Sequence, residues 1–84
     1  MLTVEMEKWG QTVDDLREQA LKAPHARTRE RFMALFEIAI GSNATQVGWA
    51  RGRNPQTVMD WVHRYNDSGP DALIYQRTGG RPPL

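Results

Sequence analysis

Side chains that can hydrogen-bond to base edges and phosphates recur at helical spacing within residues 54–69. At about 100° per residue, an outward helix face and its flank would carry Gln56, Thr57, Asp60, His63 and Arg64. A glutamine can pair with adenine, a threonine with a phosphate or a thymine methyl group, and an arginine with guanine or phosphate. The pattern predicts a DNA-contacting surface. The alternative is a solvated polar face, which Asp60 favours unless its carboxylate accepts from a cytosine amino group.

The same stretch contains the features that would make it a helix. Asn54 is a suitable N-cap, and Pro55 suits the first helical position because its missing N–H costs nothing there. An apolar stripe at i, i+3, i+4 and i+7 gives the helix one buried side, formed by Val58, Trp61, Val62 and Tyr65. Gly69 can end the helix in the left-handed conformation. We therefore predict a recognition helix over 55–67.

A second short helix comes just before this one. Asn43 can cap a helix over 44–51, and Gly52 provides a tight turn, which together with the next helix matches a helix-turn-helix. In that motif the second helix enters the major groove. Arg51, Arg53 and Asn54 surround the turn, and Asn54 with the first free N–H groups of the helix could hold a phosphate.

Two residues of the 44–51 helix call for separate explanations. Gly48 would lie beside the buried positions, where the absence of a side chain allows close helix approach. Trp49 would then point away from the core, which is unusual for tryptophan. It is either shielded by residues 1–11 or part of a dimer or DNA-backbone contact, and we favour shielding.

The remaining chain predicts an all-α domain. Thr12 and Asp15 form a capping box for a helix over 13–22, and a longer helix over 25–40 ends at Gly41. Residues 70–73 are expected to form one helical turn that folds Leu73 back on Trp61 or Tyr65. The expected core consists of Val13, Leu16, Ala20, Phe32, Leu35, Phe36, Ala39, Ile40, Val47, Ala50, Val58, Trp61, Val62, Tyr65 and Leu73. Met33 and Met59 are expected to serve packing.

Three parts are expected along the chain: a lead segment over 1–11, the helical domain over 12–74 and an arm over 75–84. The lead is either flexible or a short strand, and only Trp9 in it is expected to be anchored. The arm is rich in glycine, proline and arginine, which excludes regular structure. Gly80, Arg81 and Pro82 could lie in an A·T-rich minor groove, with Arg77 on a nearby phosphate. The alternative for the arm is an ordinary linker.

Composition limits the function classes. The 84 residues carry a net charge of +1, but residues 24–84 hold eight arginines, no lysine and five carboxylates, a net charge of +3. Arginine suits bidentate contacts to phosphate and guanine. Cysteine is absent, and His25 and His63 lack further ligands at metal spacing, so we expect no metal site and no cofactor. No Ser-His-Asp set, phosphate loop or buried carboxylate pair suggests catalysis, and no small-molecule substrate is expected.

The sequence also lacks membrane and secretion signals. No apolar run approaches the ~18 residues that span a bilayer, and the N-terminus lacks the order of a signal peptide. We therefore expect a cytoplasmic, nucleoid-associated protein with double-stranded DNA as its partner and no membrane contact.

The stretch QTVMDWVHRYNDSGPDALIYQRTGGRPP resembles the N-terminal helix-turn-helix domain of bacterial insertion-sequence transposases of the mariner-like superfamily. The resemblance covers 44–83 well and 12–41 only by helix pattern. It implies a homeodomain-like fold whose recognition helix reads terminal inverted repeats through Gln56, Thr57, Asp60, His63 and Arg64. It also implies that Gly80, Arg81 and Pro82 track the adjacent minor groove.

The chain departs from that family pattern at three points. Arg51 and Arg53 replace the usual apolar residues around the turn, and Gly48 replaces the usual alanine, which suggests a looser turn with extra positive charge near DNA. The acidic catalytic domain expected after Pro83 is missing. The chain is therefore expected to be either a transposase fragment or a stand-alone DNA-binding protein derived from one. The rival function is a dimerising, antitoxin- or repressor-like interaction module that uses Trp49 and residues 1–11.

Overall fold

The computed structural model describes residues 3–74, and this part of the chain contains only helices, turns and loops. Its elements are η1 (Met6–Trp9), α1 (Val13–Lys22), α2 (Ala26–Ala39), α3 (Ala44–Arg51), α4 (Pro55–Ser68) and η2 (Pro70–Leu73), where η denotes a 3-10 helix. The all-α prediction is confirmed. The predicted single turn after Gly69 is η2.

Each α-helix begins where a side chain satisfies an otherwise unpaired backbone N–H. Thr12 and Asp15 form the predicted capping box of α1, and Asn43 forms a second one with Gln46 at the start of α3. His25 was predicted to be the first residue of α2. Instead its Nδ1 accepts a hydrogen bond from the backbone N–H of Arg27, so His25 is the N-cap and the helix begins at Ala26.

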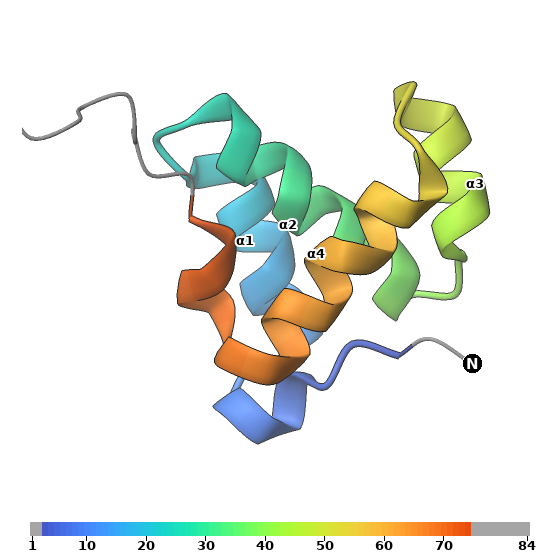
Figure 1. Ribbon diagram of the computed structural model, residues 1–84. Helices are drawn as coiled ribbons and strands as arrows, with labels where there is room; N and C mark the ends of the chain where they lie inside the picture. The colour runs from blue at the N-terminus through green and yellow to red at the C-terminus, as the bar shows by residue number, and fades with distance from the viewer. Residues whose placement is uncertain (1–2, 75–84) are drawn as a thin grey trace, which may run out of the picture.

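Helices α1 and α2 lie side by side, and α4 crosses in front of them, with α3 packed against the N-terminal half of α4 (Figure 1). Arg29 stabilises the short connection between α1 and α2, because its Nη1 donates to the carbonyl oxygen of Ala23 at 2.6 Å. The η2 turn packs back against α4 and α2. This arrangement leaves the side of α4 that faces away from α1 and α2 uncovered.

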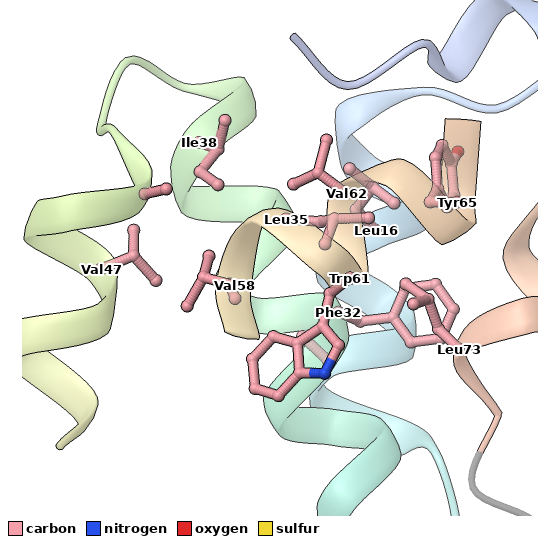
Figure 2. Close-up of a cluster of buried hydrophobic side chains, with 13 residues drawn as sticks. Leu16, Phe32, Leu35, Ile38, Val47, Val58, Trp61, Val62, Tyr65 and Leu73 are labelled. Carbon is pink, nitrogen blue, oxygen red and sulfur yellow. The ribbon is translucent and has the colours of Figure 1, made fainter. Parts of the chain in front are cut away.

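One hydrophobic core joins all four α-helices and η2 (Figure 2). Its largest fully buried side chains are Leu16, Phe32, Leu35, Val58, Val62, Tyr65 and Leu73. Burying a side chain of this size contributes about 1.5–3 kcal/mol. Leu73 is completely buried, so the predicted return of η2 to the core is confirmed.

Several predicted core positions are wrong. Ala50 is exposed, because the inward stripe of α3 is Ala44, Val47 and Gly48, and position 50 falls outside it. Ile40 is 61% exposed at the end of α2, whereas Phe36 and Ala39 pack against the core but are only half-buried. Ala34 and Ile38 are buried in their place. Helix α2 packs against α1 on one side and against α3 and α4 on another, so its buried surface is wider than the single stripe assumed from the sequence.

Two smaller expectations also need adjustment. Val13 is half-buried rather than buried. Met33 and Met59 pack against the core as predicted. Gly69 ends α4 with a positive φ of 90°, but its ψ of −176° is extended rather than left-handed helical.

Candidate nucleic-acid interface

The turn between α3 and α4 is closed by its backbone. Gly52 adopts the left-handed conformation, with φ 68° and ψ 27°. This lets the N–H of Arg53 donate to the carbonyl oxygen of Gly48 at 2.8 Å. A Cβ atom on Gly48 would lie 2.9 Å from the Arg53 carbonyl oxygen, so only glycine fits this approach. The close approach predicted for Gly48 is confirmed, and the expectation of a looser turn is wrong.

The N-terminus of α4 projects from this turn. The Oδ1 of Asn54 accepts from the N–H of Gln56 at 2.8 Å, which confirms Asn54 as the N-cap. Pro55 is the first helical residue, as predicted. Asn54 and Gln56 are both exposed. The positive end of the helix dipole is therefore exposed to solvent, beside amide side chains that can accept and donate hydrogen bonds.

The uncovered side of α4 carries the residues singled out from the sequence. Gln56, Asp60, His63 and Arg64 are exposed, and Thr57 is half-buried on the flank towards α2. The Nε2 of Gln56 donates to the Oδ1 of Asp60 one turn along the helix, at 3.3 Å. The predicted buried stripe of Val58, Trp61, Val62 and Tyr65 is confirmed. Because the apolar stripe of α4 packs against the core, the polar side chains on its opposite side are exposed together.

The two arginines of the turn each pair with a carboxylate of α2. The guanidinium of Arg53 forms a bidentate pair with Glu30, in which Nε and Nη2 each lie 2.7 Å from a carboxylate oxygen. Arg51 Nη2 lies 3.4 Å from Glu37 Oε2. The hydrogen bond from Arg53 lowers the pKa of Glu30, against an opposing effect of burial. In the same way, Glu30 raises the pKa of Arg53. Neither acidic partner was foreseen from the sequence.

A comparison with family models matches residues 25–74 to the homeodomain-like domain. This match spans α2, α3, α4 and η2, which is more than half of the chain. The chain belongs to the homeodomain-like domain family. No significant match was found among curated proteins or among solved structures.

Homeodomain-like domains of the helix-turn-helix kind are in general DNA-binding modules, so membership points to DNA as the class of partner. Within the matched region, α3 and α4 are the two helices of the motif. The elements η1 and α1 lie outside it.

Residues 3–11 form an N-terminal clasp on the C-terminal half of α4 of the homeodomain-like unit. The side chain of Asn66 bonds to two of its backbone groups, accepting from the N–H of Glu5 and donating to the carbonyl oxygen of Thr3, both at 2.8 Å. Lys8 Nζ donates to the carbonyl oxygen of Asn66 at 2.9 Å. The clasp is neither a strand nor a flexible lead, because residues 6–9 form η1.

Aromatic contacts anchor the clasp. Trp9 is half-buried and packs against the core, as predicted. A Cβ atom on Gly69 would lie 3.1 Å from the Trp9 ring, so the end of α4 meets the indole closely. The clasp lies on the C-terminal half of α4 and not on α3, so the expected shielding of Trp49 by this segment is wrong. Trp49 on α3 is 74% exposed.

Tyr65 links the clasp to the core, and its ionisation makes stability depend on pH. Its hydroxyl donates to Gln11 Oε1 at 2.6 Å. Burial raises the pKa of the phenol from 10.0 to about 12, with the charge of Asp15 adding to the rise. The unfolded chain releases this proton near its ordinary value, whereas the folded protein holds it to a higher pH. This contribution to stability is thus complete below pH 10 and is lost as the pH rises through 12.

We therefore expect the free energy of unfolding, measured by urea denaturation, to fall between pH 10 and 12 more steeply in the parent protein than in Tyr65→Phe. At neutral pH the variant should be less stable by about 1 kcal/mol because it loses a hydrogen bond. Titration of other groups is common to both proteins and cancels in the comparison. Parallel declines in the two proteins would contradict the assignment.

The predicted arm residues Arg77, Gly80, Arg81 and Pro82 lie outside the described residues. Within residues 3–74, no helix is both long and apolar enough to cross a membrane. No cluster of three or more histidine or carboxylate side chains suited to a metal ion occurs in that same part of the chain.

Proposed function

We propose that this homeodomain-like protein binds double-stranded DNA sequence-specifically, with α4 in the major groove. The observation that carries the proposal is the uncovered face of α4, where Gln56, Asp60, His63 and Arg64 are exposed together beyond a closed helix-turn-helix turn. A helix that is buried on one side and polar on the other fits the major groove, N-terminal residues first.

The side chains nearest the N-terminus of α4 would read bases. Gln56 and Asp60 already hydrogen-bond to each other, so they would act as one unit with several acceptor oxygens. Such a unit suits the exocyclic amino groups of adenine and cytosine. His63 and Arg64, about one turn beyond Asp60, would contact guanine or phosphate, and Thr57 a phosphate or a thymine methyl group.

The positive charge that contacts the DNA backbone would come from residues before and after α4 in the chain. The outer face of α4 holds Asp60 and Asp67 against Arg64, so it attracts phosphate weakly. Arg51, Arg53 and the capped helix start at Asn54 would supply phosphate contacts around the turn. From the sequence we propose that Gly80, Arg81 and Pro82 follow the adjacent minor groove and that Arg77 contacts a phosphate.

The resemblance of residues 44–83 to mariner-like transposases suggests a narrower role. We propose that the domain recognises the terminal inverted repeats of a mobile element, or regulates transcription from such sites. It would be non-catalytic by itself and would act in the cytoplasm, on the nucleoid. Catalysis in such a system would require a separate nuclease domain.

The test is selection of bound sequences from random duplexes at two salt concentrations. We expect one motif to be enriched, flanked by an A·T tract where the arm lies. Gln56→Ala should relax the preference at one position and cost roughly 1–3 kcal/mol there. Arg81→Ala should weaken binding to all sequences and lower the salt slope by about 1.

Gln19→Ala is the matched control, since Gln19 is exposed on α1, away from the proposed interface. It should leave both affinity and preference unchanged. Unchanged DNA affinity in the double variant Gln56→Ala, Arg81→Ala would rule out the proposal.

The second candidate is a dimerising interaction module, favoured by the exposed apolar side chains of Trp49 (74%) and Ile40 (61%). It would appear in sedimentation as a stable oligomer that Trp49→Ala dissociates, with little salt-dependent affinity for DNA. A monomer that enriches one motif would exclude this candidate.

A further inference from the structure

A cleft of about 180 Å³ opens on the flank of α4, between α2 and the helix-turn-helix turn. Its lining consists of Arg27, Glu30, Arg31, Arg53, Thr57 and Trp61. Three guanidinium groups and one carboxylate give these side chains a net charge of +2. The described part of the chain is otherwise rich in carboxylates, so this cleft is a local concentration of positive charge beside the recognition helix.

The Arg53 guanidinium in this cleft already binds an oxyanion. Its Nε and Nη2 each lie 2.7 Å from one oxygen of the Glu30 carboxylate. Two parallel N–H groups of arginine recognise a carboxylate and a phosphate with the same geometry. The Arg53 side chain is 48% exposed, so it can turn towards solvent without leaving the turn.

The cleft also has the right position for the backbone of a duplex. Thr57 lines it, and the neighbouring Gln56 points to the uncovered face of α4. When a recognition helix lies in the major groove, the sugar-phosphate strands run along its flanks. A strand on this flank passes the mouth of the cleft.

We propose that this cleft seats one backbone phosphate of the bound duplex, and that Glu30 occupies the same position on Arg53 until DNA replaces it. The proposal rests on the proposed function and adds a role for Glu30. Binding at this point is an exchange of one anion for another on Arg53. Glu30 thereby weakens binding to DNA of any sequence. The difference in affinity between target and other sequences then depends more on the side chains of the uncovered face of α4.

Ion exchange makes a definite prediction about salt. Each phosphate neutralised on B-DNA releases counterions and contributes about 0.9 to the slope of log K against log salt. In the parent protein the displaced Glu30 carboxylate remains beside the phosphate and repels it, which opposes this contribution. In Glu30→Gln this opposing charge is gone, so the slope should steepen, by at most about 0.9. Affinity at low salt should rise roughly 5-fold, since an exposed ion pair no longer has to be broken.

The measurement is fluorescence anisotropy of a labelled 30-base-pair random-sequence duplex over a series of NaCl concentrations. Glu18→Gln is the control, because it removes the same charge from an exposed ion pair with Lys22 on α1. The control should leave the slope unchanged. Equal shifts of slope in Glu30→Gln and Glu18→Gln would overturn the phosphate seat, since the effect would then come from net charge alone.

A second measurement locates the phosphate directly. Ethylation of single phosphates, on a duplex recovered by selection, should reveal one position that interferes with the parent protein and no longer interferes with Arg53→Gln. An identical interference pattern in both proteins would overturn the proposal that the cleft holds a phosphate. It would not contradict the proposed DNA binding. Absence of salt-dependent binding by the parent protein would instead overturn the proposed function itself.

Discussion

Replacing Phe32 with alanine is expected to lower the free energy of unfolding by about 3–5 kcal/mol, because it removes a large aromatic side chain from the centre of the core. Phe32 is 1% exposed and lies where α2, α4 and η2 meet (Figure 2). A domain of this size is stabilised by about 5–15 kcal/mol in total, so the loss is a large fraction of its stability. Urea denaturation followed by circular dichroism measures it directly.

Leu21→Ala is the control for this variant. Leu21 is an apolar residue of α1 but is 57% exposed, so its truncation leaves no cavity and should change stability by less than about 0.5 kcal/mol. Comparable losses of unfolding free energy in the two variants would contradict the placement of Phe32 at the centre of the core.

Replacing Gly48 with valine is expected to damage both stability and DNA binding. The first added carbon would lie 2.9 Å from the Arg53 carbonyl oxygen and 3.1 Å from Pro55 Cα, both of them backbone atoms that cannot turn away. Overpacking of this kind costs about 1–3 kcal/mol. The gain in helix propensity on replacing glycine by valine is only about 0.3 kcal/mol and does not offset it.

The relief of this clash would push α4 away from α3 and change how the recognition helix is presented. DNA affinity should therefore fall even at temperatures where Gly48→Val is fully folded, as shown by circular dichroism on the same samples. Ala50→Val is the control, since Ala50 is exposed on the same helix. A fully folded Gly48→Val protein with unchanged affinity would show that the close approach does not set the position of α4.

The features predicted correctly from sequence are those that depend on near neighbours in the chain. Thr12, Asn43 and Asn54 each cap the helix that follows within three residues, and their types alone indicate helix starts. The apolar stripe of α4 and the close approach at Gly48 were likewise local. For this reason the helix-turn-helix could be recognised before its packing was known.

The features that sequence could not predict depend on how distant elements meet. Glu30 and Arg53 are 23 residues apart, and their pairing follows only from the packing of α2 beside the turn. Asn66 and Thr3 are 63 residues apart, and no periodicity in residues 1–11 marks the clasp. The buried width of α2, which takes in Ile38 and leaves Phe36 half-exposed, depends on contacts with two neighbours at once.

The N-terminal clasp has a thermodynamic consequence for recognition. Helix α4 is held at its N-terminal end by the closed turn. Near its C-terminal end, Asn66 is held by hydrogen bonds from Glu5 and Lys8 of the clasp. A helix that is fixed at both ends before it meets its ligand loses little conformational entropy on association. Less of the interaction free energy of the base-reading side chains would then be offset by ordering of the helix, with no folding step to slow the encounter. The residues outside the homeodomain-like match thus act as a preorganising support for the residues inside it.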